Sequence, residues 1–316
     1  MPTQLEQLAQ LSCIVADTGD LAAIRRWQPQ DATTNPSLLL AVAKSADAAP
    51  LLTAAREAGP AVAGSSEQQL AAACDHLAVA VGSEITRLVP GYVSTEVDAR
   101  LSFDRDATVA RAQGLIDRYL AVGVDPTRVL IKIAATWEGI AAARILEQRG
   151  IHCNLTLLFH FAQAQACADA GVTLISPFVG RITDYYKAQQ GVTCFPPEQD
   201  PGVLSVRRIH NHFKRHGYRT IIMGASFRTP EQVLALAGCD RLTISPVLLA
   251  ELASSSLPIS AALHPATAVT PPPAAIEESA FRWQLNDCPM TSDKLSDGIR
   301  RFARDQEALE ALLSAS

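Results

Sequence analysis

The chain has 316 residues, of which 48% are hydrophobic but only 5% aromatic, and its formal net charge is −5 at neutral pH. A core of Ala, Leu, Val and Ile is typical of parallel sheets wrapped by helices, so the composition favours an α/β fold over a β-sandwich. The negative charge and the lack of a long Lys/Arg run argue against nucleic acid as a partner. No apolar stretch reaches the roughly 18 residues that a membrane-spanning helix needs, so we expect no membrane partner.

The cysteine content and the first residues bear on cellular location. Seven cysteines, an odd number without a CxxC pair, indicate reduced thiols. The opening segment, MPTQLEQLAQ, lacks the basic and apolar regions of a secretory signal. We therefore expect a cytoplasmic protein.

Eight short apolar segments alternate with Ala- and Leu-rich helical stretches, the pattern of parallel βα units. We expect strands at residues 12–16, 32–35, 92–97, 129–134, 153–158, 174–177, 220–225 and 241–245. Eight such strands close most naturally into a (β/α)8 TIM barrel, although strand count alone leaves an open doubly wound sheet as an alternative. A barrel can take up the whole chain, so residues 1–316 are expected to form a single domain.

Three stretches outside the strands have clear character. Residues 107–122 and 138–149 carry apolar residues at helical spacing, and Gly150 ends the second stretch, as expected of helices outside a barrel. Residues 258–273 include HPATAVTPPP and cannot continue a helix. We expect this segment to be a surface linker before a last amphipathic helix at 293–313.

Lys132 stands out because lysine is scarce and this one lies within an apolar strand, VLIKIA. Strand alternation places its side chain on the same face as Leu130 and Ala134. Burial of an unpaired ammonium is costly and favours the neutral amine, which can attack a ketone to form an imine. The alternative is a structural lysine paired with a buried carboxylate, and this strand alone does not separate the two.

Polar residues at or near the carboxyl ends of the other strands favour the functional interpretation, because barrel active sites are built there. These residues are Asp17, Thr33, Thr34, Asn35, Ser94, Glu96, Asn154, Thr156 and Ser176, with Phe178 following Ser176. Burying so many polar groups around one lysine is hard to explain by stability. Asp17 and Glu96 lie on different strands, where two carboxylates in different surroundings can divide acid and base work.

Two arginines follow the sixth and seventh strands: Arg181 in SPFVGR and Arg228 in MGASFR. Guanidinium groups suit phosphate, and barrels often bind phosphate with their last loops, so we expect a phosphorylated substrate. The alternative is a pair of surface arginines bound to acidic side chains. No HxH, HExxH or Cys/His cluster is present, which argues against a metal-dependent aldolase, and no GxGxxG follows a strand.

Nine segments together resemble transaldolases over nearly the whole chain. They are VADTGD (15–20), QPQDATTNPSL (28–38), VSTEVDARLS (93–102), VLIKIAATWEG (129–139), CNLTLLF (153–159), ISPFVGRITDYY (175–186), DPGVLSV (200–206), MGASFR (223–228) and LAGCDRLTISP (236–246). The resemblance implies a class I, Schiff-base enzyme of the long-chain bacterial branch. Such an enzyme reversibly moves a dihydroxyacetone unit from sedoheptulose 7-phosphate to glyceraldehyde 3-phosphate in the pentose phosphate pathway, without cofactor or metal, and forms a homodimer.

Roles follow from the resemblance position by position. It implies Lys132 as the imine-forming nucleophile, Asp17 as the acid/base at the C4 hydroxyl, and Glu96 with Thr156 and a water as the proton handler for the imine. The remaining residues implied in substrate binding are Asn35, Asn154, Ser176 and Phe178 around the dihydroxyacetone unit, and Arg181, Ser226 and Arg228 at the phosphate. Residues 44–66 and 257–274 show no matching pattern.

Two alternatives to a transaldolase stand beside this interpretation. A fructose-6-phosphate aldolase on the same barrel would share the lysine but release free dihydroxyacetone, whereas Glu96 with Thr156 beside the apolar Phe178, and the longer chain, favour the transferase. A catalytically inactive barrel that binds sugar phosphates as a regulator would be expected to lack Lys132, Asp17 or Glu96, and none of them is lacking.

Overall fold

A computed structural model describes residues 2–314, and its centre is a closed barrel of eight parallel strands. Each strand pairs with its neighbours in chain order, and β8 pairs with β1 to close the ring. The strands are β1 (Cys13–Asp17), β2 (Asp31–Thr33), β3 (Val93–Glu96), β4 (Val129–Ala134), β5 (Cys153–Leu158), β6 (Leu174–Pro177), β7 (Ile221–Gly224) and β8 (Arg241–Ile244). The expected (β/α)8 TIM barrel is therefore confirmed, and the open sheet is excluded.

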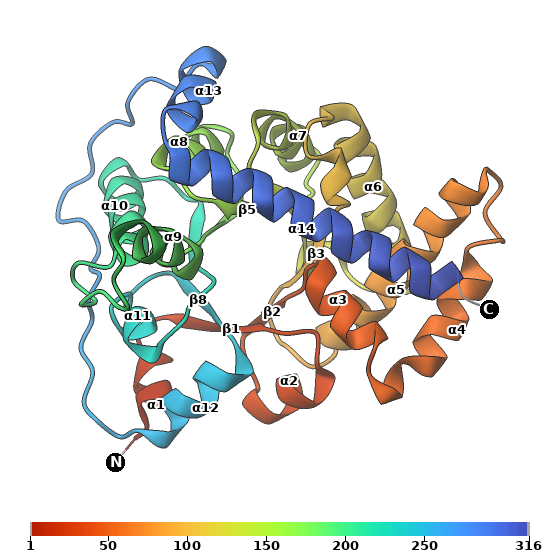
Figure 1. Ribbon diagram of the computed structural model, residues 1–316, viewed down its shortest axis with the longest axis horizontal. Coiled ribbons are helices and arrows are strands. Elements are labelled where there is room, and N and C mark those ends of the chain that lie inside the picture. The colour runs from red at the N-terminus through yellow and green to blue at the C-terminus, as the bar shows by residue number, and fades with distance from the viewer. Residues whose placement is uncertain (1, 315–316) are drawn as a thin grey trace.

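Helices surround the barrel, and the last of them crosses its face (Figure 1). In the described residues they are α1 (Gln4–Leu8), α2 (Leu21–Trp27), α3 (Pro36–Ala43), α4 (Ala49–Ala58), α5 (Ser66–Thr86), α6 (Arg105–Ala121), α7 (Trp137–Gln148), α8 (Phe161–Asp169), α9 (Gly180–Gln190), α10 (Pro201–His216), α11 (Pro230–Leu234), α12 (Pro246–Ser254), α13 (Glu278–Asn286) and α14 (Pro289–Ser314). Short 3-10 turns lie at Ala46–Ala48, Ala99–Leu101 and Pro126–Arg128. No helix between residues 2 and 314 is long and apolar enough to cross a membrane.

The expected strands agree closely with those observed: β4, β5 and β6 match residue for residue, and the other five differ by at most two residues at an end. Helix α6 begins two residues before the expected start because Asp104 caps it, accepting a hydrogen bond from Ala107 N at 2.9 Å. The proline-rich segment runs along the outside of the barrel as expected (Figure 1). The sequence reasoning missed α13 between this segment and α14, and it placed the start of α14 four residues too late.

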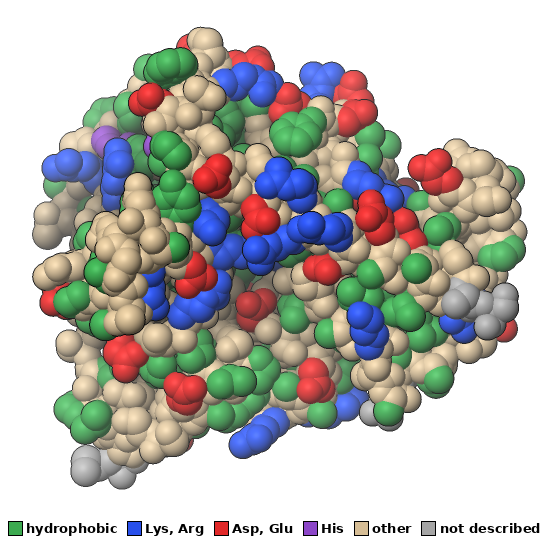
Figure 2. All heavy atoms as spheres, in the orientation of Figure 1, with side chains coloured by type: hydrophobic (Ala, Val, Ile, Leu, Met, Phe, Trp, Pro, Cys, Tyr) green, Lys and Arg blue, Asp and Glu red, His purple; other side chains and the backbone are tan. Residues whose placement is uncertain are grey.

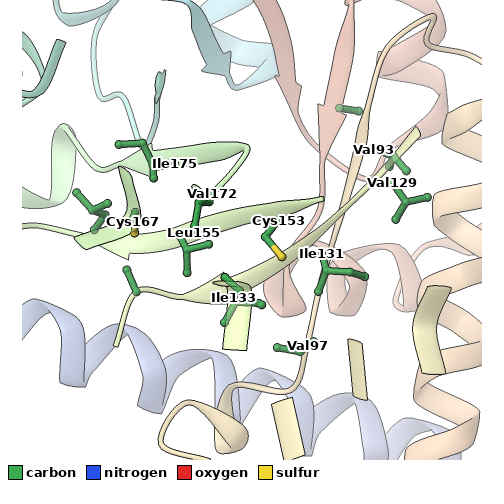
Figure 3. Packing of buried hydrophobic residues seen from close by; sticks show 14 of the residues in the cluster. Val93, Val97, Val129, Ile131, Ile133, Cys153, Leu155, Cys167, Val172 and Ile175 are labelled. Carbon is green, nitrogen blue, oxygen red and sulfur yellow. The ribbon is translucent and has the colours of Figure 1, made fainter. Parts of the chain in front are cut away.

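Alternation along the strands separates an outer apolar layer from the barrel interior. Val129, Ile131 and Ile133 of β4 pack with Cys153 and Leu155 of β5 in the large core between strands and helices (Figure 3). The intervening residues of β4 point the other way, into the barrel. There, Leu130 joins Val15, Leu174 and Met223 in a small apolar cluster. Leu130 precedes Lys132 by two residues on the same face of β4, so this cluster lies next to Lys132 on the amino-terminal side.

Strand register places the polar residues of the interior beside one another. Lys132 on β4 is paired with Glu96 on β3 on one side and with Asn154 on β5 on the other. On the far side of the ring, Asp17 on β1 is paired with Thr33 on β2. Because paired residues in a parallel ladder point to the same face, the register turns these side chains together into the barrel interior.

Candidate active site

A pocket of about 260 Å³ lies at the carboxyl-terminal end of the strands. Nine of the eleven predicted site residues line it: Asp17, Asn35, Lys132, Thr156, Ser176, Phe178, Arg181, Ser226 and Arg228. The other two adjoin the lining, since Glu96 pairs with Lys132 and Asn154 is hydrogen-bonded to Ser176. The structure therefore brings all eleven together.

A larger groove, of about 890 Å³, lies at the opposite end of the barrel between α1, α2 and the start of β8. Two of its charged side chains are paired within the protein, Asp240 with Lys214 and Arg241 with Asp31, and the third, Glu6, accepts hydrogen bonds from Thr3 in the cap of α1. Among the described residues, no three His, Cys, Asp or Glu side chains are grouped as metal ligands. Chemistry is therefore better sought in the smaller pocket.

Lys132 is buried and has a carboxylate partner. Its Nζ lies 3.3 Å from Oε2 of Glu96 and donates a hydrogen bond to the carbonyl oxygen of Thr34 at 3.2 Å. The two side chains are only 6% and 3% exposed. Of the two alternatives for this lysine, an unpaired ammonium and an ammonium paired with a buried carboxylate, the structure shows the second.

The pairing does not prevent Lys132 from acting as a nucleophile, because burial also changes the pKa of its partner, Glu96. Burial raises the pKa of Glu96, while the Lys132 ammonium opposes that rise. A carboxylate with a raised pKa is a stronger base than an exposed one, so Glu96 is suited to accept the proton that an amine must lose before it attacks a carbonyl group.

Asp17 lies at the end of β1, half-buried in the pocket wall. Burial raises the pKa of its carboxyl group, and the positive charges of Lys132, Arg181 and Arg228 oppose the rise. A carboxylate with a raised pKa is a stronger base than an exposed one, so Asp17 is suited to take a proton from an alcohol.

The polar side chains opposite Asp17 form a short hydrogen-bonded chain. Ser176 Oγ donates to Asn154 Oδ1 at 2.6 Å, and Asn154 Nδ2 donates to Ser94 Oγ at 3.0 Å. Asn35 caps α3, since its Oδ1 accepts a hydrogen bond from Leu38 N at 2.9 Å. The amide NH2 of Asn35 is therefore the part that remains for a ligand.

Three threonine hydroxyls in the pocket lining are buried without a hydrogen-bond partner in the described residues: Thr33, Thr156 and Thr243. Leaving a buried hydroxyl unpaired is costly. The three come from β2, β5 and β8, so they line the pocket from different sides. They are suited to bind water or the hydroxyl groups of a polyol.

Arg181 and Arg228 enter the pocket from two loops that meet at Gly180. Gly180 N donates to the carbonyl oxygen of Ser226 at 2.7 Å, and a Cβ at position 180 would lie 2.2 Å from that oxygen, so only glycine permits the contact. Ser226 has a left-handed backbone with φ of 62°. Its Oγ accepts a hydrogen bond from Arg228 Nη1 at 3.2 Å.

The two arginines differ in their partners. Arg228 donates from Nε and Nη2 to Asp184 Oδ2, at 3.0 and 2.9 Å. It is therefore bound to an acidic side chain, as expected of an ordinary surface arginine. Arg181 forms no ion pair within residues 2–314, and its Nη1 is buried without a partner. Lys and Arg side chains gather around the hollow below α14 (Figure 2). Glu96 is paired with Lys132 and Asp184 with Arg228. Arg181 is therefore the cation of the lining that has no ion pair within residues 2–314, which favours an anionic ligand beside it.

A family model described as Transaldolase/Fructose-6-phosphate aldolase matches residues 14–313. The chain belongs to this family. A relative named Transaldolase from Alteromonas mediterranea is 55% identical over 99% of this chain and 98% of its own. A relative named Transaldolase 1 from Pectobacterium atrosepticum is 55% identical over 99% of both chains, and a Transaldolase from Vibrio vulnificus is 52% identical over 100% of this chain and 99% of its own.

Sequence reasoning missed several lining residues of this transaldolase-family pocket, above all Phe302 and Thr243. Thr243 belongs to the segment LTISP, but it is not the last residue of β8, and the polar residues were selected at or near the ends of strands. The sequence reasoning treated the terminal helix as amphipathic, and an aromatic residue in it has the pattern of an ordinary core residue. No local signal in the sequence separates Phe302 from such a residue.

Proposed function

We propose that this chain is a transaldolase that moves a dihydroxyacetone unit from sedoheptulose 7-phosphate to glyceraldehyde 3-phosphate, giving erythrose 4-phosphate and fructose 6-phosphate, through a Schiff base on Lys132. The observation that carries the proposal is the buried Lys132–Glu96 pair, 3.3 Å apart, at a pocket that Asp17 and two arginines also line. Family membership and full-length relatives named Transaldolase support it.

The first step is imine formation. After Lys132 passes a proton to Glu96, the neutral Nζ attacks the ketose carbonyl, and Glu96 returns the proton to the departing hydroxyl, which leaves as water. The hydroxyl of Thr156 is buried without a partner in the described residues and lines the same pocket. In this proposal it holds the water through which Glu96 moves protons while the imine is formed and hydrolysed.

The second step is carbon–carbon cleavage. Asp17 takes the proton of the C4 hydroxyl, the C3–C4 bond breaks, the aldehyde leaves, and the electron pair passes to the iminium to give an enamine on Lys132. Asn35, Asn154 and Ser176 hold the hydroxyls of the three-carbon unit by hydrogen bonds. Addition of the enamine to the acceptor aldehyde reverses these events.

The phosphate of donor and acceptor binds at Arg181, Ser226 and Arg228 in this proposal. Support comes from Arg181, which lines the pocket without an ion pair in the described residues and whose Nη1 has no hydrogen-bond partner there. Phosphate binding fixes the sugar so that its carbonyl carbon reaches Lys132 at the other end of the pocket. A sugar phosphate bound in this way, with its phosphate at the arginines and its carbonyl group at Lys132, accounts for a polar pocket that has charged groups at both ends.

A fructose-6-phosphate aldolase is less well supported, although the family includes both activities. Hydrolysis requires a proton donor at the enamine carbon. Phe178, which lines the pocket and is 6% exposed, offers no such group. The relatives compared above are named Transaldolase.

The proposal extends to cellular setting and assembly: a single-domain, cytoplasmic enzyme of the pentose phosphate pathway that acts as a homodimer and needs neither cofactor nor metal. All seven cysteines are free thiols, which supports a reducing compartment. The dimer rests on the family resemblance alone. Light scattering during gel filtration tests it, and a mass near 34 kDa would contradict it.

The test of the mechanism is reductive trapping. Borohydride added with fructose 6-phosphate should leave a dihydroxyacetone adduct on Lys132, detected by peptide mass spectrometry. Lys132→Met should abolish the adduct, and Lys44→Met, at an exposed lysine, should not. An adduct on another lysine, or none in the unaltered protein, contradicts the Schiff base. A coupled assay with fructose 6-phosphate, with and without erythrose 4-phosphate, separates the two activities, because a transaldolase turns over only when the acceptor is present.

A further inference from the structure

Helix α14 contributes to the pocket as well as to the fold. It crosses the face of the barrel at which the pocket opens (Figure 1), and Phe302 from its middle lines that pocket. A small apolar cluster attaches the helix there: Met290, Ile299 and Phe302 of α14 pack with residues that end the strands, among them Leu157 and Phe178. The position of Phe302 is therefore fixed by packing.

Close approach at Gly298 sets the helix against β5 and Arg181. A Cβ at this position would lie 2.6 Å from a methyl group of Leu157 and 3.4 Å from Nη1 of Arg181. Gly298 lies four residues before Phe302, so the two share one face of the helix. The glycine contact therefore brings Phe302 over the same region, one turn further along.

Arg181 lies between two aromatic rings. Its guanidinium carbon is 4.8 Å from the ring centre of Phe178 and 5.6 Å from that of Phe302. Both distances are within the range of cation–π attraction. Since Arg181 has no carboxylate partner in residues 2–314, the rings are the groups that hold its planar head in one orientation.

The electrostatic surroundings make this support necessary. Burial lowers the pKa of Arg181, and the neighbouring charges of Arg301 and Arg228 act in the same direction, opposed by the smaller effects of Asp297 and Glu96. Arg228 differs, because Asp184 holds it. A guanidinium that is crowded by like charges and lacks an acidic partner would turn toward solvent unless packing prevented it.

We propose that Phe302 is a positioning residue that, with Phe178, holds the Arg181 guanidinium in the orientation that binds the substrate phosphate. Selectivity for phosphorylated sugars then depends on the terminal helix as well as on the barrel loops. This inference rests on the proposed function, because it assigns the phosphate to Arg181.

The test is Phe302→Leu, which keeps an apolar side chain but removes the ring. KM for fructose 6-phosphate and the inhibition constant of inorganic phosphate should each rise by about 2- to 30-fold, the range for loss of one cation–π contact, while kcat changes less. Phe302→Tyr keeps the ring and should restore both values to within about 2-fold. Trapping of phosphate-free dihydroxyacetone on Lys132 should not change.

Two controls separate positioning from general loss of structure. Phe281 is as buried as Phe302, at 2% exposure, but packs on Trp137 away from the pocket, so Phe281→Leu should leave KM unchanged. In an Arg181→Met background, Phe302→Leu should have no further effect on KM, because the group that it positions is gone.

Three results would overturn the inference. The first is an unchanged KM for fructose 6-phosphate in Phe302→Leu. The second is a loss of dihydroxyacetone trapping in Phe302→Leu as large as the rise in its KM. The third is a rise in KM on adding Phe302→Leu to Arg181→Met that equals the rise in the unaltered protein. Failure of the proposed function has a different signature, since the unaltered protein would then neither turn over fructose 6-phosphate nor form an adduct on Lys132.

Discussion

Replacing Lys132 by Met tests whether the Lys132–Glu96 pair is buried as tightly as the structure has it. The change roughly conserves volume, so packing alone predicts a small effect. It also leaves Glu96, 3% exposed in its side chain, without its ammonium partner. Removing one member of a buried ion pair costs about 3–5 kcal/mol. The variant should therefore fold but be clearly less stable at neutral pH.

The loss should depend on pH in a defined direction. The Lys132 charge opposes the rise in the pKa of Glu96, so its removal raises that pKa further. A carboxyl group with a raised folded-state pKa binds its proton more tightly when folded than when unfolded. Glu96 has a raised pKa in the unaltered protein as well, so the deficit of the variant relative to that protein grows only at pH values where Glu96 is ionised in the folded unaltered protein and still protonated in the folded variant.

Urea unfolding at pH 4.5, 6.0 and 7.5 measures this loss. Between the first and last conditions the deficit of Lys132→Met relative to the unaltered protein should increase. The double variant Lys132→Met/Glu96→Gln should recover most of it, because no charge remains to be buried. A deficit that is the same at all three pH values, or a double variant no more stable than the single one, would refute the pairing argument.

Three other substitutions test the remaining parts of the site. Asp17→Asn should lower turnover by roughly 100- to 10,000-fold while borohydride trapping survives, and loss of trapping would mean that Asp17 acts before cleavage. The same variant should be about 0.5–2 kcal/mol more stable at pH 7, since the pKa of Asp17 is raised and the cost of its charge is present only above its ordinary pKa; the gain should vanish near pH 4, and a gain of equal size at both pH values would contradict this. Arg228→Ala should raise KM for fructose 6-phosphate far more than for dihydroxyacetone, measured in parallel trapping and turnover assays, and equal effects would place Arg228 outside the phosphate site. Phe178→Tyr should increase release of free dihydroxyacetone relative to transfer by placing a hydroxyl near the enamine, and an unchanged ratio in a folded protein would show that residue 178 does not face the intermediate.

The sequence was sufficient for most of the fold because its strands are short, buried and well bounded. In β4, VLIKIA has an apolar residue at every position but one, and the barrel buries all six positions, so pattern and structure agree residue for residue. β2 was harder, since Asp31 begins a strand in which the expected start was Ala32. The side chain of Asp31 is paired with Arg241 on β8, a contact between distant segments that no local pattern reveals.

The candidate site was accessible from sequence to the same extent. Residues at strand ends converge because parallel strands share one edge, so Asp17, Lys132 and Ser176 could be assigned to one pocket without coordinates. What could not be inferred was which carboxylate is paired with Lys132, namely Glu96 on the neighbouring strand β3, and the contribution of α14. Helix α14 contacts β5, which ends more than 100 residues before α14 begins. Nothing in the sequence of α14 itself indicates where the helix packs.

Several unfavourable features of the fold lie together at one end of the barrel. Two carboxyl groups with raised pKa values, three threonine hydroxyls without partners in the described residues and a left-handed Ser226 all line or adjoin the same pocket. Each of these costs stability by itself. At the other end, Asp31 and Arg241 are paired, and an apolar cluster fills the interior. Three unpartnered hydroxyls and two buried carboxyl groups around one pocket are costly for stability, and a phosphorylated polyol and a transient imine would complete these groups when substrate binds.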